Sequence, residues 1–188
     1  MRLILASRSP QRRAILQQLG IPFEVVEPDV EELTEGPPHE LAAENAYRKA
    51  AAVASSAAGA GALVLGVDTI VALGAQVYGK PADPGAARET LTALAGRRHA
   101  VLSGVCLIEG GRARHAVAST VVEFRAMDRE LIAWYVETGE WRERAGGYAI
   151  QGRGAAIVQS IEGDYLNVVG LPVATLLELA PGLLFGGS

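Results

Sequence analysis

The chain has 188 residues, of which 49% are hydrophobic and 20% charged, and its formal net charge is −4. That charge argues against a nucleic-acid-binding protein, which usually presents a broad basic face. The single cysteine, Cys106, lies in an apolar run and leaves no disulfide to form within the chain. We therefore expect one domain over residues 1–188, a cytoplasmic location and no nucleic-acid partner.

The first elements are a strand, a turn and a helix. Residues 3–6 are apolar and predict a buried strand, and the pair Ser9-Pro10 predicts a helix start. The N–H groups of a helix N-terminus bind anions, and the guanidinium of Arg12 can bind phosphate with two parallel hydrogen bonds. Ser7 adds a hydroxyl donor. The segment therefore predicts an anion site, and a capped surface helix with solvated arginines is the alternative.

A second strand, an acidic loop and a long helix follow. Residues 22–27 alternate as a strand, residues 28–40 form a loop broken by prolines, and residues 40–57 predict a helix. Asn45 and Lys49 share one face of that helix because they lie four residues apart. The glutamates of the acidic loop are expected to face water, and they become candidate metal ligands only if a magnesium ion needs oxygen ligands.

Residues 50–67 carry no charge, which raises the possibility of a membrane span. The stretch is mostly alanine, with serines and glycines in its middle. We therefore predict a helix end, a loop and a buried strand in this stretch, and no membrane partner.

A hairpin is predicted over residues 62–80, turning at Gly74. Asp68 interrupts its first strand, where aspartate is unfavourable and rarely buried without a partner. We interpret Asp68 as catalytic or metal-binding, the alternative being an aspartate that starts a turn. Lys80 lies just past the second strand, so it could reach the same anion as Asp68 or be an exposed loop lysine.

The remaining elements alternate between helices and strands. We predict a helix over 86–95, a hairpin over 98–124, a helix over 128–137, a strand over 154–163 and a helix over 171–179. Interleaved strands and helices with hairpins predict a mixed sheet with helices packed against it.

The three histidines lack metal-ligand spacing. We expect His99 and His115 on strand surfaces. Gln151 lies in a glycine-rich stretch and presents both a donor and an acceptor, which reading the edge of a pyrimidine base requires. A turn glutamine is the alternative.

Five segments in order along the chain resemble the Maf family of nucleoside triphosphate pyrophosphatases: LASRSPQRRAIL, GVDTIV, YGKP, TGEWRERAGGYAIQG and IEGDYLNVVGLP. The resemblance implies an α/β fold similar to inosine triphosphatase, with an elongated mixed β-sheet, flanking helices and two lobes around a central cleft. It also implies a homodimer.

The resemblance further implies hydrolysis of a nucleoside triphosphate to the monophosphate and pyrophosphate, with Mg²⁺ or Mn²⁺ as cofactor. Asp68 is then the proton acceptor, and Asp68 and Glu32 bind the metal. The implied phosphate-binding residues are Ser7, Arg12, Lys49 and Lys80. The residues linked to base choice are Gln11, Thr69 and Gln151.

The segment from Tyr148 onward is similar to the branch acting on dTTP and UTP, including modified pyrimidine nucleotides. A 7-methyl-GTP pyrophosphatase and a non-catalytic nucleotide-binding regulator of septum formation are the alternatives. The chain departs from the family pattern at Gln11, which replaces an arginine, at Ala14, which replaces a glutamate, and at Trp141, which replaces a proline. Glu143 and Arg144 keep the charge signs of the family's residues at their positions.

Overall fold

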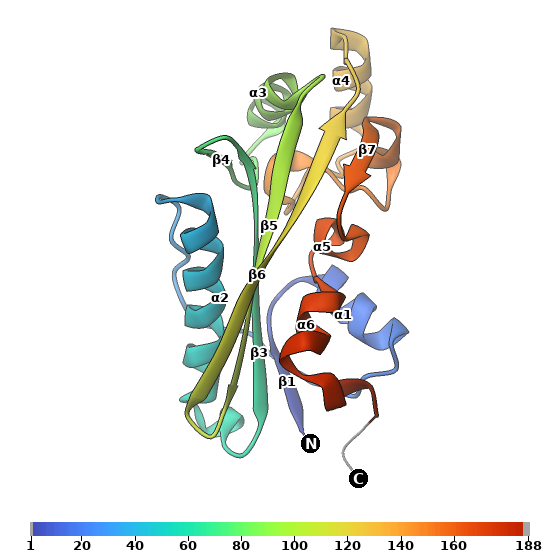
Figure 1. The fold of residues 1–188 in the computed structure, drawn as a ribbon. Coiled ribbons are helices and arrows are strands. Elements are labelled where there is room, and N and C mark those ends of the chain that lie inside the picture. Colours follow the sequence, from blue (N-terminus) through green and yellow to red (C-terminus); the bar gives the residue numbers. More distant parts are fainter. Residues whose placement is uncertain (1, 186–188) are drawn as a thin grey trace.

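One seven-stranded sheet runs through the computed structural model, which describes residues 2–185 (Figure 1). Its main path is β2-β1-β3-β5-β6-β7, and β4 pairs with β3. The strands are β1 (Leu3–Ala6), β2 (Glu24–Val26), β3 (Leu63–Leu73), β4 (Gln76–Tyr78), β5 (Arg98–Glu109), β6 (Arg112–Phe124) and β7 (Val158–Glu162). β1 is parallel to β2 and β3, and the other pairs are antiparallel, so the predicted mixed sheet is confirmed.

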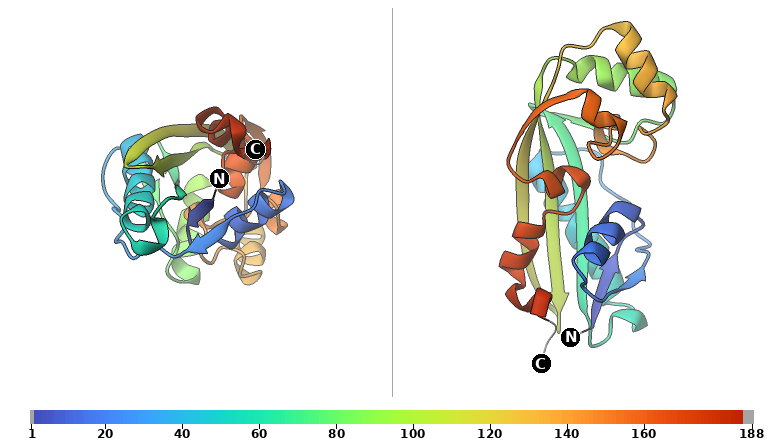
Figure 2. Two further views of the ribbon diagram at one scale, coloured as in Figure 1. Left: turned by 90° about the horizontal axis from the view of Figure 1, so that it is seen from below. Right: turned by 90° about the vertical axis from the view of Figure 1, so that its right-hand side faces the viewer.

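Helices cover both faces of this sheet (Figures 1 and 2). The helices are α1 (Pro10–Gln18), α2 (Pro38–Ala54), α3 (Pro84–Leu94), α4 (Arg129–Glu137), α5 (Tyr165–Val169) and α6 (Val173–Leu179). Along β1, Leu3 and Leu5 pack with apolar residues of α1 and α6, whereas Ile4 and Ala6 pack with α2. This alternation follows from the two-residue period of a strand and buries both faces.

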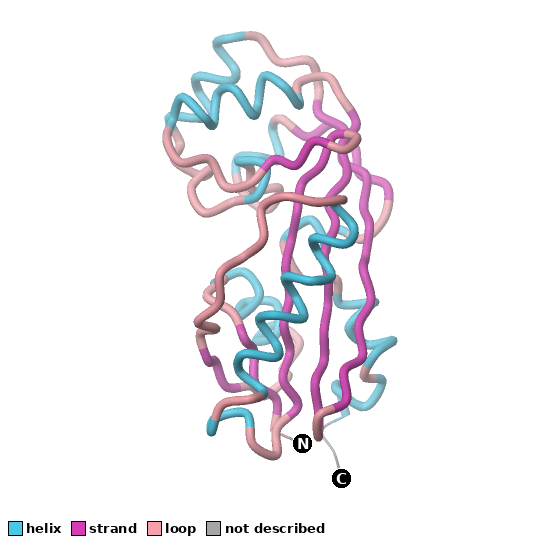
Figure 3. The backbone as a smooth tube through the Cα atoms, turned by 90° about the vertical axis from the view of Figure 1, so that its left-hand side faces the viewer, coloured by secondary structure: helices cyan, strands magenta, loops and turns pink. Residues whose placement is uncertain are grey.

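Close contact between α2 and the sheet depends on two glycines (Figure 3). A Cβ atom at Gly66 of β3 would collide with the backbone carbonyl of Ala46, and one at Gly104 of β5 would collide with that of Ala42. Only a residue without a side chain lets the helix backbone approach this closely. This close contact determines how far the side chains of α2 lie from β3.

A second apolar core lies at the other end of the sheet, where α3 and α4 pack together. Its members include Leu91, Phe124, Tyr135 and Trp141. Trp141 is 4% exposed and donates from Nε1 to the carbonyl of Val136, 3.0 Å away, which explains a tryptophan at this position. Apolar packing at both ends of one sheet corresponds to the two predicted lobes.

The predicted elements are present, with shifted ends. The helix predicted over 40–57 ends at Ala54, where Ser55 and Ser56 hydrogen-bond back to its carbonyls. The strand predicted over 154–163 is limited to Val158–Glu162 by a preceding 3₁₀ turn. Helix α5 was not predicted; Asp164 caps it by accepting from the N–H of Leu166 at 2.8 Å.

The prediction that His99 lies on a strand surface is wrong, whereas His115 is exposed as predicted. His99 is 2% exposed, and its Nε2 lies 3.0 Å from the hydroxyl of Tyr148. β5 lies inside the sheet between β3 and β6 and is covered there by aromatic rings. No helix within residues 2–185 is long and apolar enough to cross a membrane.

Candidate functional site

The site forms where one edge of β3 changes its partner strand. β1 pairs with residues 63–66 of β3, and β4 pairs with residues 71–73. Because β5 occupies the opposite edge throughout, the pairing leaves residues 67–70 facing a gap between β1 and β4. Asp68 and Thr69 lie in this gap. Because successive strand residues point to opposite faces, their side chains lie on different sides of the sheet.

A cleft of about 740 Å³ opens over this gap. Every site residue predicted from the sequence lines it, although the residues come from six separate stretches of the chain. They are Ser7, Gln11, Arg12, Glu32, Lys49, Asp68, Thr69, Lys80 and Gln151. The structure therefore brings the predicted cations, the carboxylates and the candidate base-reading groups to one place. Their individual roles stay predictions.

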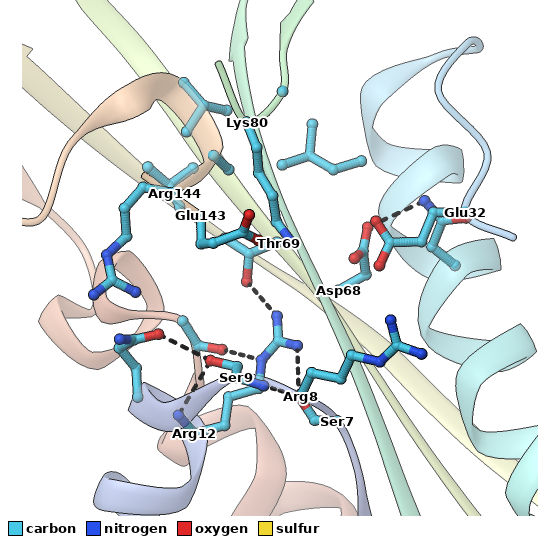
Figure 4. Close-up of a pocket in the computed structure, with 18 of the residues that line it drawn as sticks. Ser7, Arg8, Ser9, Arg12, Glu32, Asp68, Thr69, Lys80, Glu143 and Arg144 are labelled. Carbon is cyan, nitrogen blue, oxygen red and sulfur yellow. Dashed lines mark hydrogen bonds and ion pairs between the residues drawn. The ribbon is translucent and has the colours of Figure 1, made fainter. Parts of the chain in front are cut away.

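The acidic side of the cleft lies between β3 and α2 (Figure 4). Lys49 Nζ lies 2.6 Å from Asp68 Oδ1 and 2.6 Å from Glu32 Oε1. Asn45 donates to Asp68 Oδ2 at 3.2 Å, so both oxygens of that carboxylate are held by α2. Burial is the largest single influence on the pKa of Glu32 and would raise it. The attraction and hydrogen bond of Lys49, together with the charges of Lys80 and Arg12, lower that pKa overall.

The basic side of the cleft depends on Arg12. Its guanidinium donates to the carbonyl of Gly170 at 2.9 Å, to Ser7 Oγ at 3.2 Å and to Thr69 Oγ1 at 3.1 Å. A guanidinium has five N–H donors, so these three contacts fix its plane and leave two N–H groups for a ligand. Burial lowers the pKa of Arg12, and the nearby carboxylates of Asp68 and Glu32 oppose that lowering.

Ser7 is buried at the N-terminal side of α1 and has its lone pairs occupied. Its Oγ accepts from the N–H of Ser9 at 3.1 Å and from Arg12 at 3.2 Å. A hydroxyl accepts two hydrogen bonds and donates one, so the proton of Ser7 is left to donate into the cleft. This geometry suits an anionic oxygen.

The far wall of the cleft is a loop held against β4. Lys80 Nζ lies 3.2 Å from Glu143 Oε2, and the N–H of Gly146 donates to the carbonyl of Gly79 at 3.1 Å. Glu143 has a φ of 57°, an uncommon value for a residue other than glycine. Lys80 follows the second strand of a hairpin, as predicted; it is an exposed loop lysine that also lines the cleft with Asp68. That it reaches the same anion as Asp68 stays a prediction.

Gln151 lies on an exposed turn and lines the cleft. Glu140 holds this turn by accepting from the N–H groups of Arg153 at 3.0 Å and Gly154 at 3.2 Å. Across the cleft, Gln11 accepts from the hydroxyl of Ser9 at 3.1 Å. The two glutamines therefore come from different segments, and both line the cleft.

Asn45 and the cleft-lining arginines Arg8, Arg142 and Arg144 were not among the predicted site residues. A signal for Asn45 was present in the sequence, since it shares a helix face with Lys49. For Arg142 and Arg144, the only signal in the sequence was their positive charge. Their position in the cleft depends on the fold of the 142–147 loop.

Within residues 2–185, no group of three or more histidine, cysteine, aspartate or glutamate side chains forms a metal site. The carboxylates of Asp68 and Glu32 nevertheless lie close enough together that Lys49 Nζ contacts both. Mg²⁺ is commonly bound by one or two carboxylates plus substrate phosphates and waters. The two carboxylates therefore fit a divalent cation that takes its other ligands from a phosphorylated ligand.

The fold and the site together define an α/β protein with a cleft suited to a small polyanion. A family model described as Maf-like protein matches residues 2–182, and the chain belongs to this family. The chain is 50% identical to a dTTP/UTP pyrophosphatase of Symbiobacterium thermophilum, over 94% of this chain and 91% of that one. It is 44% identical to a dTTP/UTP pyrophosphatase of Thermococcus gammatolerans, over 94% of each. A solved HAM1 protein from Coxiella burnetii has a TM-score of 0.48 and 19% identity, over 84% of this chain and 91% of that one.

Proposed function

We propose that this chain hydrolyses dTTP and UTP, and modified pyrimidine nucleoside triphosphates, to the monophosphate and pyrophosphate. The observation that carries the proposal is the convergence of Arg12, Lys49 and Lys80 with Asp68 in one cleft. The cleft volume lies within the ~300–1,000 Å³ range of small-molecule sites. Relatives named dTTP/UTP pyrophosphatase, 40–50% identical over most of the chain, support the choice of base.

Asp68 positions the attacking water in this proposal. Asn45 of α2 donates to one oxygen of its carboxylate, and the carboxylate keeps lone pairs for the water. The carboxylate takes the proton as the water attacks the α-phosphorus, and pyrophosphate leaves. Arg12, Lys80 and the hydroxyl of Ser7 bind the phosphate oxygens, where negative charge develops.

We also propose a divalent cation, Mg²⁺ or Mn²⁺, held by Asp68 and Glu32. When bound, it neutralises charge on the phosphate oxygens. The rest of the site serves to hold the triphosphate and the water in line.

The test is pyrophosphate release from a panel of canonical, modified and 7-methylated nucleoside triphosphates in the presence of Mg²⁺. We expect dTTP and UTP to be hydrolysed fastest, and EDTA to stop the reaction. Preference for 7-methyl-GTP would assign the chain to another branch, and nucleotide binding without pyrophosphate release would support a regulator. Light scattering on the same sample tests the predicted homodimer.

A further inference from the structure

Lys49 occupies an unusual place between the two carboxylates. Its ammonium contacts Asp68 and Glu32 at 2.6 Å each, and the side chains of Lys49 and Asp68 are each only 9% exposed. Electrostatic contacts shielded from water are much stronger than exposed ones. A single ammonium therefore holds together two acids that come from different segments, the 27–37 loop and β3.

The composition of the chain sets Lys49 apart. Of its 17 basic residues, 15 are arginines and only two are lysines, Lys49 and Lys80. Both lysines line the cleft, and both contact a carboxylate across it. Lysine carries a compact charge on a flexible stem, whereas the guanidinium of arginine is a planar fork. A small, movable cation therefore lies at two positions in the cleft where it contacts a carboxylate of another segment: Lys49 contacts Asp68, and Lys80 contacts Glu143.

We propose that Lys49 occupies the place of the divalent cation between Asp68 and Glu32 until nucleotide arrives, so that metal and polyphosphate bind together. This inference rests on the proposed function, because it takes the polyphosphate as the second ligand. The phosphate oxygens give the ammonium a new anionic partner, and its four-carbon stem allows it to follow them. Both carboxylates are then free for the metal.

Metal binding without nucleotide is less favourable in this proposal. The metal must separate Lys49 from the buried carboxylate of Asp68 and the half-exposed one of Glu32. That leaves the ammonium without a partner, which is costly for a buried charge. Metal binding to the nucleotide-free protein is therefore weak. By linkage, nucleotide raises the affinity for metal by the same factor as metal raises the affinity for nucleotide.

The test measures Mn²⁺ binding by electron paramagnetic resonance without nucleotide, in the wild type and in Lys49→Met. Methionine keeps an unbranched stem and removes the charge. We expect Lys49→Met to bind Mn²⁺ at least about tenfold more tightly, since two unpaired carboxylates then face each other. Adding Asp68→Asn to Lys49→Met should abolish that gain. Arg48→Met is the matched control, because it removes an exposed positive charge from the same helix and should leave Mn²⁺ affinity unchanged.

A second readout is the melting temperature. We expect Lys49→Met to melt below the wild type in EDTA and to recover with Mn²⁺, because a ligand that binds only the folded state stabilises it. Mn²⁺ should leave the wild type almost unchanged. The proposal is overturned if Lys49→Met binds Mn²⁺ no more tightly than the wild type, or if it stays unfolded when Mn²⁺ is present. Neither readout involves a nucleotide, so failure here is distinct from failure of the proposed activity.

Discussion

Asn45 donates from Nδ2 to Oδ2 of Asp68 across 3.2 Å, and the same amide also holds the backbone of Leu33. Its Oδ1 accepts from the N–H of Leu33 at 2.8 Å, and its Nδ2 donates to the carbonyl of Leu33 at 3.0 Å. One side chain of α2 therefore fixes both the candidate base and the acidic loop that carries Glu32. Asn45 is a positioning residue for the two carboxylates.

Replacing Asn45 with alanine should lower kcat by about 10- to 100-fold, since small displacements of a reacting group cost that much. It should also destabilise the protein by about 1–3 kcal/mol, because buried polar groups lose their partners. Steady-state kinetics and urea unfolding measure the two effects. Arg48→Ala, on the exposed face of the same helix, should change stability by less than about 0.5 kcal/mol. Equal kinetics in both variants would contradict the role of Asn45.

Asp68→Asn should retain the fold and the nucleotide affinity measured without metal, but lose about 10²–10⁴-fold in kcat with Mg²⁺, which is the usual contribution of a positioned base. The amide keeps the size of the carboxylate and cannot accept the proton. Single-turnover kinetics and nucleotide binding separate the two quantities. Asp83→Asn is the control, because Asp83 caps α3 outside the cleft and asparagine caps helices equally well. Near-wild-type turnover in Asp68→Asn would show that another group is the base.

Arg12→Ala should lower kcat/KM by about 10²-fold, with a rise in KM and a fall in kcat, since phosphate contacts strengthen as charge moves to the leaving group. Steady-state kinetics with dTTP measure both kcat and KM. Arg13→Ala is the matched control, because Arg13 is the next residue in α1 and lies 3.8 Å from Glu27. An unchanged kcat/KM in Arg12→Ala would remove Arg12 from the phosphate site.

Local structure was predictable where a few neighbouring residues decide it. Ser9 and Pro10 determine the start of α1, and Gly74 turns the hairpin, because caps and turns depend on short-range geometry. Asp68 was recognisable as a site residue because a carboxylate in a buried strand needs a partner. The identity of that partner was not predictable. It depends on how closely α2 approaches β3, which Gly66 and Gly104 set from distant positions.

The misplacement of His99 has a related cause. Alternation along a strand indicates which residues share a face, but not whether that face is covered. β5 is covered on both faces, so His99 is buried although its neighbours in sequence look like those of a surface strand. The short helix α5 was missed because its five residues are too few to show a helical period.

Gln151→Ala should reduce the preference for pyrimidine over purine triphosphates by about tenfold, roughly the contribution of one lost hydrogen bond. The kcat for dTTP should change little, because Gln151 lies on an exposed turn and is proposed to contact the base, not the reacting phosphate. Ratios of kcat/KM across the nucleotide panel measure the effect. Gln76→Ala, on β4 and outside the cleft lining, is the control. Equal losses for all bases would argue against base reading by Gln151.

His99 should make the protein less stable in mild acid. Burial lowers the pKa of His99 from 6.5 to about 4, against a smaller raising effect of the backbone at Arg97. Between these values the unfolded chain binds a proton that the folded protein does not, so stability is full above about pH 6.5 and falls as the pH drops to about 4. The loss attributable to His99 is roughly 3 kcal/mol at most.

The comparison of the wild type with His99→Gln isolates this contribution, because the carboxylates titrate in both proteins. Glutamine can still hydrogen-bond the hydroxyl of Tyr148, which lies 3.0 Å from His99 Nε2, and it does not titrate. Urea unfolding at a series of pH values between about 4 and 7 should give a shallower loss of stability in His99→Gln. His115→Gln, on the exposed part of β6, should follow the wild type. Parallel pH profiles for the wild type and His99→Gln would mean that His99 is protonated in the folded protein as readily as in the unfolded chain.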